Sequence, residues 1–560
     1  MGTRRWESWR WAMLLLSALY AAAVLYVLPF ATNDGPVHMS FAHLLGGGPD
    51  SGVLQAQHYR RNSALHPNLA VYGLAVLLLK GMRPELAEAL VQLACLLGPV
   101  AGTALVLSQF QRRQQWVALF AFPLALHQLF FMGLYNYCLS VTGFLVSIAA
   151  LMWMQKRPGA ACAVAPIAAL YVTYFSHAAG FLAAMVAVGV LTALSFAAAW
   201  REAGAGPAAA VRRHARHAAV LMSPLPLALL AMGGALGAAG NEVAFGAPLD
   251  QRLRGFAFLA PLNLHHTPMD RYLVPLLAAA ILGSVGILAL LAVRSALAPA
   301  RFPGNGRARA ALLLFAALLA LALAFPDTMG GGWTHYRRMQ MFPYFAGLLC
   351  MACLRLGRRA RNALAALAIA VSLALIAGGT WRQQRIKQQL APMLEVERLV
   401  GRHCTVLPLL LDDGGAWASG MALPPKYRPF FHAATRLELH GDRVALFNYL
   451  ARLQVYPVQF KPGQDTQALL FHWLPQQEET AVARVDIAGY ERASGQAVDY
   501  ILQWGALASA PAPLRAEVLR ALAGYAPVYT APGGAVRLYR RAEPAAGAGP
   551  RTHCTSAPPD

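Results

Sequence analysis

Acidic residues are scarce in this chain. Asp and Glu number 25 among 560 residues, and all charged residues together make up only 13%. Hydrophobic residues make up 57%, and long apolar runs recur from the N-terminus to about residue 380, which no soluble chain needs. The scarcity of charge therefore excludes a soluble globular protein and indicates a multi-pass membrane protein.

Nucleotide-binding motifs are also missing. The sequence has no GxxxxGK[ST] loop for a nucleoside triphosphate and no GxGxxG turn after a strand for a dinucleotide. Its 16 histidines lack metal-ligand spacing, because no two of them lie at i, i+4 beside a carboxylate. These absences argue against enzymes that bind nucleotides and against a histidine-based metal centre.

Positive charge is plentiful, with 47 Lys and Arg and a net charge of +22, but it is not concentrated as in a nucleic-acid-binding protein. It falls in short clusters between the apolar runs. Lys and Arg in short loops resist translocation, so each cluster is expected on the cytoplasmic side. The clusters are Arg112/Arg113, Lys156/Arg157, Arg201 with Arg212, Arg213 and Arg216, Arg294 to Arg309, and Arg355 to Arg361.

The topology depends on two ambiguous apolar runs. Residues 11–30 follow Arg4, Arg5 and Arg10 as a secretory signal would, but the run is long and many spans follow, so we expect a retained first helix. Residues 68–80 are too few to cross the ~30 Å hydrocarbon layer. Were they to cross, all the basic clusters would lie outside. We therefore predict that they form an interfacial or re-entrant helix in a long first outer loop.

The spans are then predicted at 11–30, 84–108, 116–132, 134–154, 159–176, 178–200, 218–240, 272–294, 310–326, 339–355 and 362–380. Eleven spans that start in the cytoplasm place the N-terminus inside and the C-terminus outside, in the periplasm or the extracellular space. The fold class is thus an all-α polytopic membrane domain, residues 1–380, followed by a small exported α/β domain, residues 381–560.

The composition changes at WRQQRIKQQ (381–389), where the exported domain is expected to begin. CTVLPLLL and VDYILQW are typical of strands, APLRAEVLRALAGY of a helix, and PVYTAPGGAVRLYRR of a closing hairpin. The acidic pair Asp412-Asp413 is expected in a turn at a strand end. A flexible tail is predicted from about residue 543. We expect this domain to act as a lid or a stabilising element over the outer face.

Only two of the seven cysteines, Cys404 and Cys554, fall in the exported domain. In an oxidising compartment they would pair as a disulfide that ties the tail to the first strand, and the alternative is two unpaired thiols. The other five lie in predicted spans, where a thiol is most often a small core hydrophobe. These five are Cys95, Cys138, Cys162, Cys350 and Cys353.

Polar residues gather at the outer ends of the predicted spans. A charge at the bilayer centre costs roughly 2.5–3.5 kcal/mol on insertion scales, so such groups normally line a cavity or its rim. The sequence therefore predicts a polar cavity that opens outward. Its candidate lining residues are Asp34, His127, Gln128, Asn136, His177, His265, His266, Asp327, His335, Arg337 and Arg338.

Three stretches of the sequence, together with the order of the predicted spans and loops, resemble a known family. TNDGPVH (32–38) follows the first span, HPNLAVYGLAVLLL (66–79) supplies the interfacial helix, and the basic YRRM (336–339) enters the tenth span. With them, the chain resembles the GT-C superfamily of integral-membrane glycosyltransferases, of the protein O-mannosyltransferase and aminoarabinose transferase type. Architecturally the resemblance covers most of the chain.

The resemblance implies that Asp34 is the catalytic base and that sugar comes from a polyprenyl-phosphate donor. The acceptor must lose or share a proton as it attacks the anomeric carbon, and a nearby carboxylate can take that proton. Many family members have two adjacent acids here, whereas this chain has Asn33, so we expect no divalent metal and no other cofactor. The alternative is that Asp34 merely caps the helix that follows.

Cationic groups at the rim would bind the lipid phosphate and stabilise it as it departs. The candidates are Arg60, Arg61, His177, Arg337 and Arg338. Each has a plainer alternative. Arg60 and Arg61 would only contact lipid headgroups, Arg337 and Arg338 would snorkel to the outer surface, and His177 would be a hydrogen-bonded structural residue.

The function expected from the resemblance is sugar transfer at the outer face of a bacterial-type inner membrane, with a lipid-linked donor and membrane lipids as partners and no nucleic acid. Three alternatives stay open. A transporter or flippase of lipid-linked glycans would show inverted repeats, which the sequence lacks. A polymerase or ligase would place its large outer loop between late spans. A non-catalytic envelope-assembly protein would need no acid in its first loop.

Overall fold

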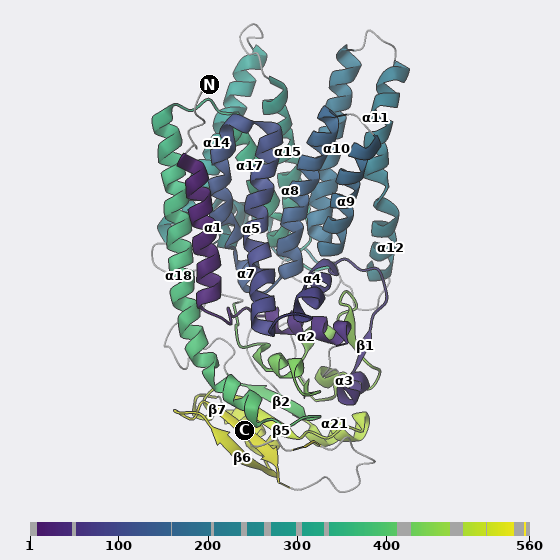
Figure 1. The fold of residues 1–560 in the computed structure, drawn as a ribbon, viewed down its shortest axis with the longest axis vertical. Helices are drawn as coiled ribbons and strands as arrows, with labels where there is room; N and C mark the ends of the chain where they lie inside the picture. Colours follow the sequence, from purple (N-terminus) through teal and green to yellow (C-terminus); the bar gives the residue numbers. More distant parts are fainter. Residues whose placement is uncertain are drawn as a thin grey trace.

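The helices of the N-terminal part stand side by side in a tall bundle, and the C-terminal part covers its lower end (Figure 1). This computed structural model describes residues 8–47, 52–157, 160–202, 207–236, 243–262, 270–297, 305–329, 335–411, 427–470, 485–510, 512–542 and 554–555. His265, His266, Asp412, Asp413 and the predicted tail other than Cys554 and Thr555 lie outside these residues.

Seven helices within the described ranges are long and apolar enough to cross a membrane. Each coincides with a predicted span, so the polytopic helical fold is confirmed and the chain is an integral membrane protein. They are α1 (Ser8–Tyr26), α5 (Pro84–Phe110), α8 (Tyr135–Lys156), α10 (Ala178–Glu202), α14 (Asp270–Leu297), α15 (Asn305–Ala324) and α18 (Arg358–Leu399).

Shorter pieces occupy the other four predicted spans. The spans 159–176 and 339–355 are each occupied by one helix, α9 (Ala160–Ser176) and α17 (Met341–Cys353), whereas the other two are broken. Breaks occur where proline or a non-helical residue interrupts the helix, as at Pro224 and at His127, whose extended backbone begins a new helix. The pieces are η1 (Arg112–Phe120), α6 (Ala121–Ala125), α7 (Gln128–Phe131), α11 (Pro207–Met222), α12 (Leu225–Leu236), α16 (His335–Met339) and α17 (Met341–Cys353).

The first loop forms a layer of short elements under the bundle (Figure 1). It holds α2 (Gly35–Gly46), α3 (Val53–His58), β1 (Tyr59–Arg61) and α4 (Ala70–Leu79). The ten residues of α4 rise about 15 Å, half of what a crossing needs. The prediction that residues 68–80 form an interfacial or re-entrant helix, too short to cross the membrane, agrees with this length.

The C-terminal part is built on a five-stranded sheet of order β3-β2-β5-β7-β6. The strands β3, β2 and β5 run parallel, and β7 pairs antiparallel with β5 and β6. The predicted strands, hairpin and helix are all present, and Gly533 and Gly534 take positive φ in the hairpin turn. The elements are β2 (Thr405–Leu410), β3 (Val444–Ala445), β5 (Tyr500–Trp504), α22 (Ala512–Ala521), β6 (Tyr525–Thr530) and β7 (Val536–Arg541).

The predicted domain boundary at residue 380 lies inside α18, which continues without a break to Leu399. The lower end of this helix joins the loop after α1, because Gln383 accepts the N–H of Ala31 at 3.0 Å and donates to its carbonyl at 2.9 Å. A single helix thus carries the chain out of the bundle and anchors its start to the first loop.

Residues 427–460, which we call the docking segment, lie between the sheet and the bundle. The segment holds η4 (Ala433–Leu439), β3, η5 (Tyr449–Arg452) and β4 (Val458–Phe460). Strand β4 pairs antiparallel with β1 of the first loop, with Tyr59 opposite Phe460. The first loop and the C-terminal part therefore share one small sheet, although about 400 residues separate its strands.

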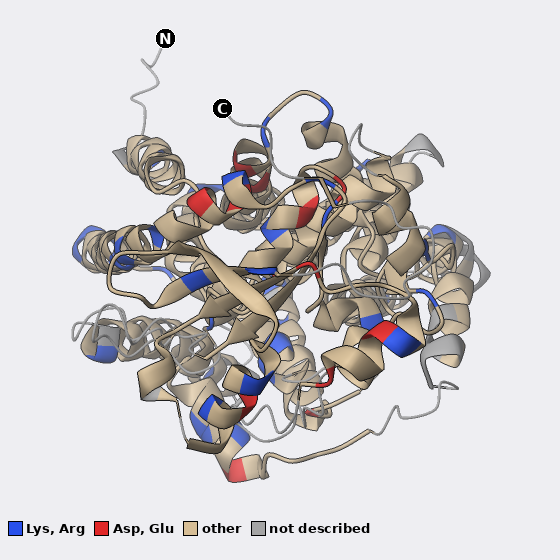
Figure 2. Ribbon diagram, turned by 90° about the horizontal axis from the view of Figure 1, so that it is seen from below, with Lys and Arg blue, Asp and Glu red and all other residues tan. Residues whose placement is uncertain are grey.

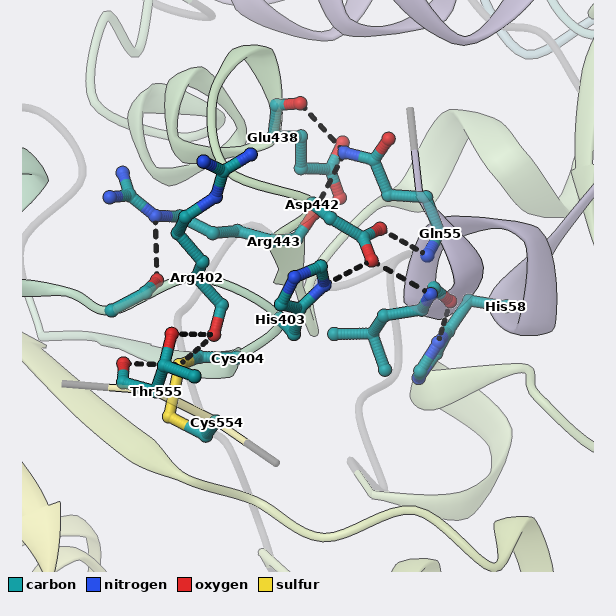
Figure 3. Close-up of polar contacts among 12 residues, drawn as sticks. Gln55, His58, Arg402, His403, Cys404, Glu438, Asp442, Arg443, Cys554 and Thr555 are labelled. Atoms are coloured by element: carbon teal, nitrogen blue, oxygen red, sulfur yellow. Dashed lines mark hydrogen bonds and ion pairs between the residues drawn. A yellow bond between two sulfur atoms is a disulfide. The ribbon is translucent and has the colours of Figure 1, made fainter. Parts of the chain in front are cut away.

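Polar contacts hold α3 to the docking segment (Figure 3). Buried Asp442 accepts the N–H groups of Leu54 at 3.0 Å and Gln55 at 2.9 Å, and it contacts His403 Nδ1 at 2.7 Å. Nearby, the sulfurs of Cys404 and Cys554 are joined in a disulfide at 2.10 Å, which fastens the end of the chain to the start of β2.

The charges on this end of the molecule are of both signs. Seen from below, basic and acidic positions lie next to one another at several places (Figure 2). One such pair is Arg452 with Asp465, at 2.9 Å and partly exposed. Exposed pairs of this kind contribute little to stability, so the burial of apolar residues between sheet, docking segment and bundle holds this end together.

Candidate functional site

The backbone around Asp34 is fixed against the turn between α7 and α8. The N–H of Asn33 donates to the carbonyl of Phe131, and the N–H of Asp34 donates to that of Met132, both at 3.2 Å. Gly133 in this turn has φ +76° and lies directly against the backbone of Asp34 and Gly35. The acid of the first loop is thus held on the bundle itself.

The Asp34 carboxylate does not cap the helix that it precedes. Asp34 occupies the position before α2, but its side chain makes no hydrogen bond to the first amides of that helix. Its φ of −101° and ψ of −5° are not the extended values with which a capping side chain reaches those amides. The carboxylate is therefore left for other partners.

The surroundings of Asp34 favour a proton on its carboxyl group. Its side chain is 16% exposed, and Oδ1 lies 3.7 Å from Nε2 of His432 in the docking segment. Burial raises the pKa of Asp34 to about 7, and the nearby positive charge of Arg338 opposes that rise. The pKa of the Tyr456 phenol is raised, mainly by burial and in addition by the negative charge of the nearby Asp34. A carboxyl group that titrates near neutrality suits a general base.

Arg338 meets His177 rather than an acid. Its Nη1 lies 2.9 Å from Nε2 of His177, and the other ring nitrogen of His177 accepts the N–H of Ala179 at 3.0 Å. A neutral imidazole has one donor and one acceptor, so Nε2 carries the proton and faces another donor. Buried Nε of Arg338 has no hydrogen-bond partner. Among the described residues no acid forms an ion pair with this guanidinium, and a guanidinium without such a partner can bind an anion.

The other three predicted cationic residues lie at different distances from this centre. Arg337 is next to Arg338 and contacts Gln128 Oε1 at 3.5 Å, at the edge of the site. Arg60 and Arg61 are exposed on β1, where they donate to Gln459 at 3.2 Å and to the carbonyl of Leu44 at 3.3 Å. The structure therefore brings together Asp34, His177 and Arg338, but not the pair on β1.

A second buried acid, Glu88 on α5, is not among the residues predicted from the sequence. It forms an ion pair with Arg436 of the docking segment at 2.9 Å and accepts the Tyr135 hydroxyl at 2.9 Å. A Cβ on Gly35, the residue after Asp34, would lie 2.2 Å from a carboxylate oxygen of Glu88. Glu88 therefore packs directly against the start of α2. A charged acid one turn inside an apolar span costs free energy, and such residues normally line a cavity or have a partner. The position of Glu88 in the apolar run is therefore the signal by which the sequence could have identified it.

Two buried histidines complete the surroundings. His38 lies one turn after Asp34 on α2, its Nδ1 is 2.7 Å from the Tyr72 hydroxyl, and its Nε2 has no partner. Burial lowers the pKa values of His38 and His432, to about 4 and about 3, so both are neutral. His38 belongs to the TNDGPVH stretch, but neither its position nor that of His432 in the sequence predicts that it lies near Asp34.

The expected absence of a metal stays a prediction. Asn33 stands where a second acid would supply a ligand, and its side-chain oxygen accepts the N–H of Arg428 at 2.7 Å. One described group of donor atoms, from Cys404, Asp499 and Cys554, is close enough to hold an ion, but both sulfurs are bonded to each other.

Gly133→Ala tests how tightly the Asp34 loop is held. An added Cβ would meet backbone nitrogens of Gly35 at 2.7 Å and Asp34 at 2.8 Å, which no side-chain rotation relieves. Gly463 is the matched control, because its φ of +79° is similar and its surroundings are open. Thermal unfolding should show a loss of about 1–2 kcal/mol for Gly463→Ala from backbone strain, and about 1–3 kcal/mol more for Gly133→Ala. Equal losses would contradict the close packing.

No family model and no curated protein matches this chain. Among solved structures, ArnT from Cupriavidus metallidurans bound to undecaprenyl phosphate is similar at 12% identity, with 97% of this chain and 99% of that chain covered and a TM-score of 0.53. Its apo structure is similar at 11% identity, with 94% and 97% covered and the same TM-score. The two chains share a fold from end to end, so the predicted resemblance to GT-C proteins is confirmed at the level of architecture.

Proposed function

We propose that this protein is a glycosyltransferase of the cytoplasmic membrane, which moves a sugar from a polyprenyl-phosphate-linked donor to an acceptor on the outer face. The observation that carries the proposal is the Asp34 carboxylate. It does not cap α2, it is mostly buried, and it lies near the guanidinium of Arg338, which has no acidic partner among the described residues. The shared fold supports it, because the similar ArnT structure contains undecaprenyl phosphate.

The two charged groups suit opposite ends of one transfer step. The acceptor hydroxyl or amine gives its proton to Asp34 as its oxygen or nitrogen attacks the anomeric carbon. The bond between that carbon and the phosphate oxygen breaks, and both electrons leave with the polyprenyl phosphate. Arg338, whose guanidinium lies beside His177, would stabilise this added negative charge.

The basic clusters support an outward-facing site. Lys156 at the end of α8 contacts the side chain of Gln109 at 3.2 Å, and Arg307 at the start of α15 contacts Gln111 at 2.7 Å. These ends of α8 and α15 lie at the upper end of the bundle, whereas α2 and α4 lie at its lower end (Figure 1). If the basic end faces the cytoplasm, Asp34 faces outward, where the C-terminal part also lies.

The pH dependence of transfer follows from the raised pKa of Asp34. The base acts only when deprotonated, so a pKa of about 7 makes the rate rise as pH increases through 7. Single-turnover transfer between pH 5 and pH 9 should therefore show an acidic limb centred near pH 7, with the rate falling about tenfold per pH unit below it. A rate independent of pH from 5 to 7 would exclude Asp34 as the base.

The experiment that tests the function is transfer from radiolabelled polyprenyl-phosphate sugars to endogenous acceptors. Membranes with the native protein are compared with membranes from a deletion strain and from that strain complemented with the native chain. A labelled product that requires the protein supports the proposal. If no donor gives one, flippase activity on lipid-linked glycans is measured next in vesicles that contain the purified protein, because a flippase moves label across the bilayer without transferring it.

A further inference from the structure

The docking segment reaches under Asp34 from the opposite end of the sequence. Its residue His432 places Nε2 3.7 Å from Oδ1 of Asp34, although 398 positions separate the two in the chain. The neutral imidazole of His432 thus gives this carboxylate a polar contact from the C-terminal part of the chain. The acid therefore has a neighbour that the membrane part does not supply.

Contacts on both sides of His432 fix the segment in this place. The Tyr427 hydroxyl donates to the carbonyl of Ala31 at 2.9 Å, and the N–H of Arg428 donates to Asn33 at 2.7 Å. After His432, Arg436 pairs with Glu88 at 2.9 Å. These anchors join the residues just before Asp34 and the acid beneath it, so His432 cannot leave without breaking several buried bonds.

The imidazole itself is arranged for one polar contact. It is 1% exposed and packs against the rings of Phe431 and Phe447, whose centroids lie 4.6 and 5.7 Å away. Its Nδ1 has no hydrogen-bond partner. Burying a polar ring in this way costs free energy unless it forms a compensating bond. Asp34 is the group that offers such a bond to Nε2, and contacts of this kind often shorten when substrate binds.

We propose that His432 is a positioning residue for Asp34, whose Nε2–H orients the carboxylate and stabilises its charged form, so that the C-terminal part completes the active site. This inference rests on the proposed glycosyltransferase function. It gives the exported residues a direct part in the reaction in addition to covering the outer face. The acceptor then meets a base that is held from two sides, by the bundle through its backbone and by the docking segment through its carboxylate.

A change at position 432 should shift the pH profile. The neutral N–H donor stabilises the Asp34 anion, so its loss raises the pKa of Asp34 and moves the acidic limb to higher pH. Other groups around the pair stay in place and act equally in every variant. The titratable and charged groups that face the two residues are Arg338, Tyr72, Tyr456 and His38.

The test compares His432→Gln, His432→Asn and His432→Phe in the full-length protein. The amide of Gln reaches the position of Nε2 and keeps a donor toward Asp34, whereas the shorter Asn amide lies near Nδ1. We expect kcat close to that of the native protein for Gln. For Asn and Phe we expect a loss of about 10- to 100-fold, the size of one hydrogen bond to a charged group, with an upward shift of the acidic limb. KM for the lipid donor should change little.

The control is His440→Phe, which makes the same replacement on the same segment at a side chain that is 45% exposed. Asn and Gln differ by one methylene and are both polar, so a comparison between them does not depend on whether the Phe variant folds. Native-like kcat and pH profile for both Asn and Gln would overturn the role of His432 while leaving the proposed function intact. Absence of transfer by the native protein would instead overturn the proposed function.

Discussion

Asp34→Asn is expected to lower the rate of sugar transfer by about 10²- to 10⁴-fold, the range over which a general base contributes. The variant keeps the shape of the side chain and removes its ability to accept the acceptor's proton. Donor binding should be nearly unchanged, because Arg338 and His177 remain in place. Single-turnover rates with a radiolabelled polyprenyl-phosphate sugar measure the first effect, and the dependence of the rate on donor concentration measures the second.

The same variant should keep its stability. The Asp34 side chain makes no capping bond that Asn would lose, and a carboxyl group with a pKa of about 7 is already about half protonated at neutral pH. We expect thermal unfolding to change by less than about 1 kcal/mol. Asp465→Ala is the contrasting control, since Asp465 does cap its helix by accepting the N–H groups of Gln467 and Ala468, and loss of such a cap costs about 0.5–2 kcal/mol. Full activity in Asp34→Asn would leave a transporter or an assembly protein as the better interpretation.

Arg436→Met is expected to produce the largest loss of stability. It removes the partner of Glu88 from a pair in which the side chains are 11% and 3% exposed. Removing one partner of a buried ion pair typically costs about 3–5 kcal/mol, because the other charge is left buried and unpaired. Hydrogen exchange of residues 427–439 should accelerate, since this pair holds the docking segment on α5.

A double replacement separates the charge from the packing. Glu88→Gln combined with Arg436→Met removes both charges, so it should be more stable than Arg436→Met alone. Arg452→Met is the control on the same segment, because its pair with Asp465 is about one-third exposed and should contribute less than about 1 kcal/mol. If Arg436→Met and Arg452→Met unfold alike, the Glu88 pair does not hold the segment.

Local chemistry made most of the fold predictable. The length of each apolar run distinguished α5 and α8 from the short α4, and Gly533-Gly534 marked the hairpin between β6 and β7. The interrupted span at 116–132 was harder, because its residues other than His127 and Gln128 are apolar and the break depends on the backbone at His127 and its neighbours. Apolar composition specifies burial, but it does not specify whether a buried segment is one helix or three pieces.

The site was predictable only where it is local. Asp34 was identified from its place after the first span, and Arg338 from a charge at the start of an apolar run. The partners from the C-terminal part had no such signal, since His432 and Arg436 stand in a segment whose aromatic and basic residues resemble those of any core and surface. Their positions depend on how β4 pairs with β1, and residues 400 apart leave no pattern of spacing in a single sequence.

The pairing of β1 with β4 can form only late in synthesis, because the two strands are made far apart in time. Tyr59 is made about 400 residues before Phe460, an interval of roughly 20–80 s at 5–20 residues per second. Throughout this interval the first loop lacks its neighbouring strand and the anchors at Ala31, Asn33 and Glu88. The surroundings of Asp34 are therefore incomplete in the nascent chain until the docking segment has been made. A chain that ends before residue 427 would therefore contain the helices of the bundle but lack His432 and Arg436.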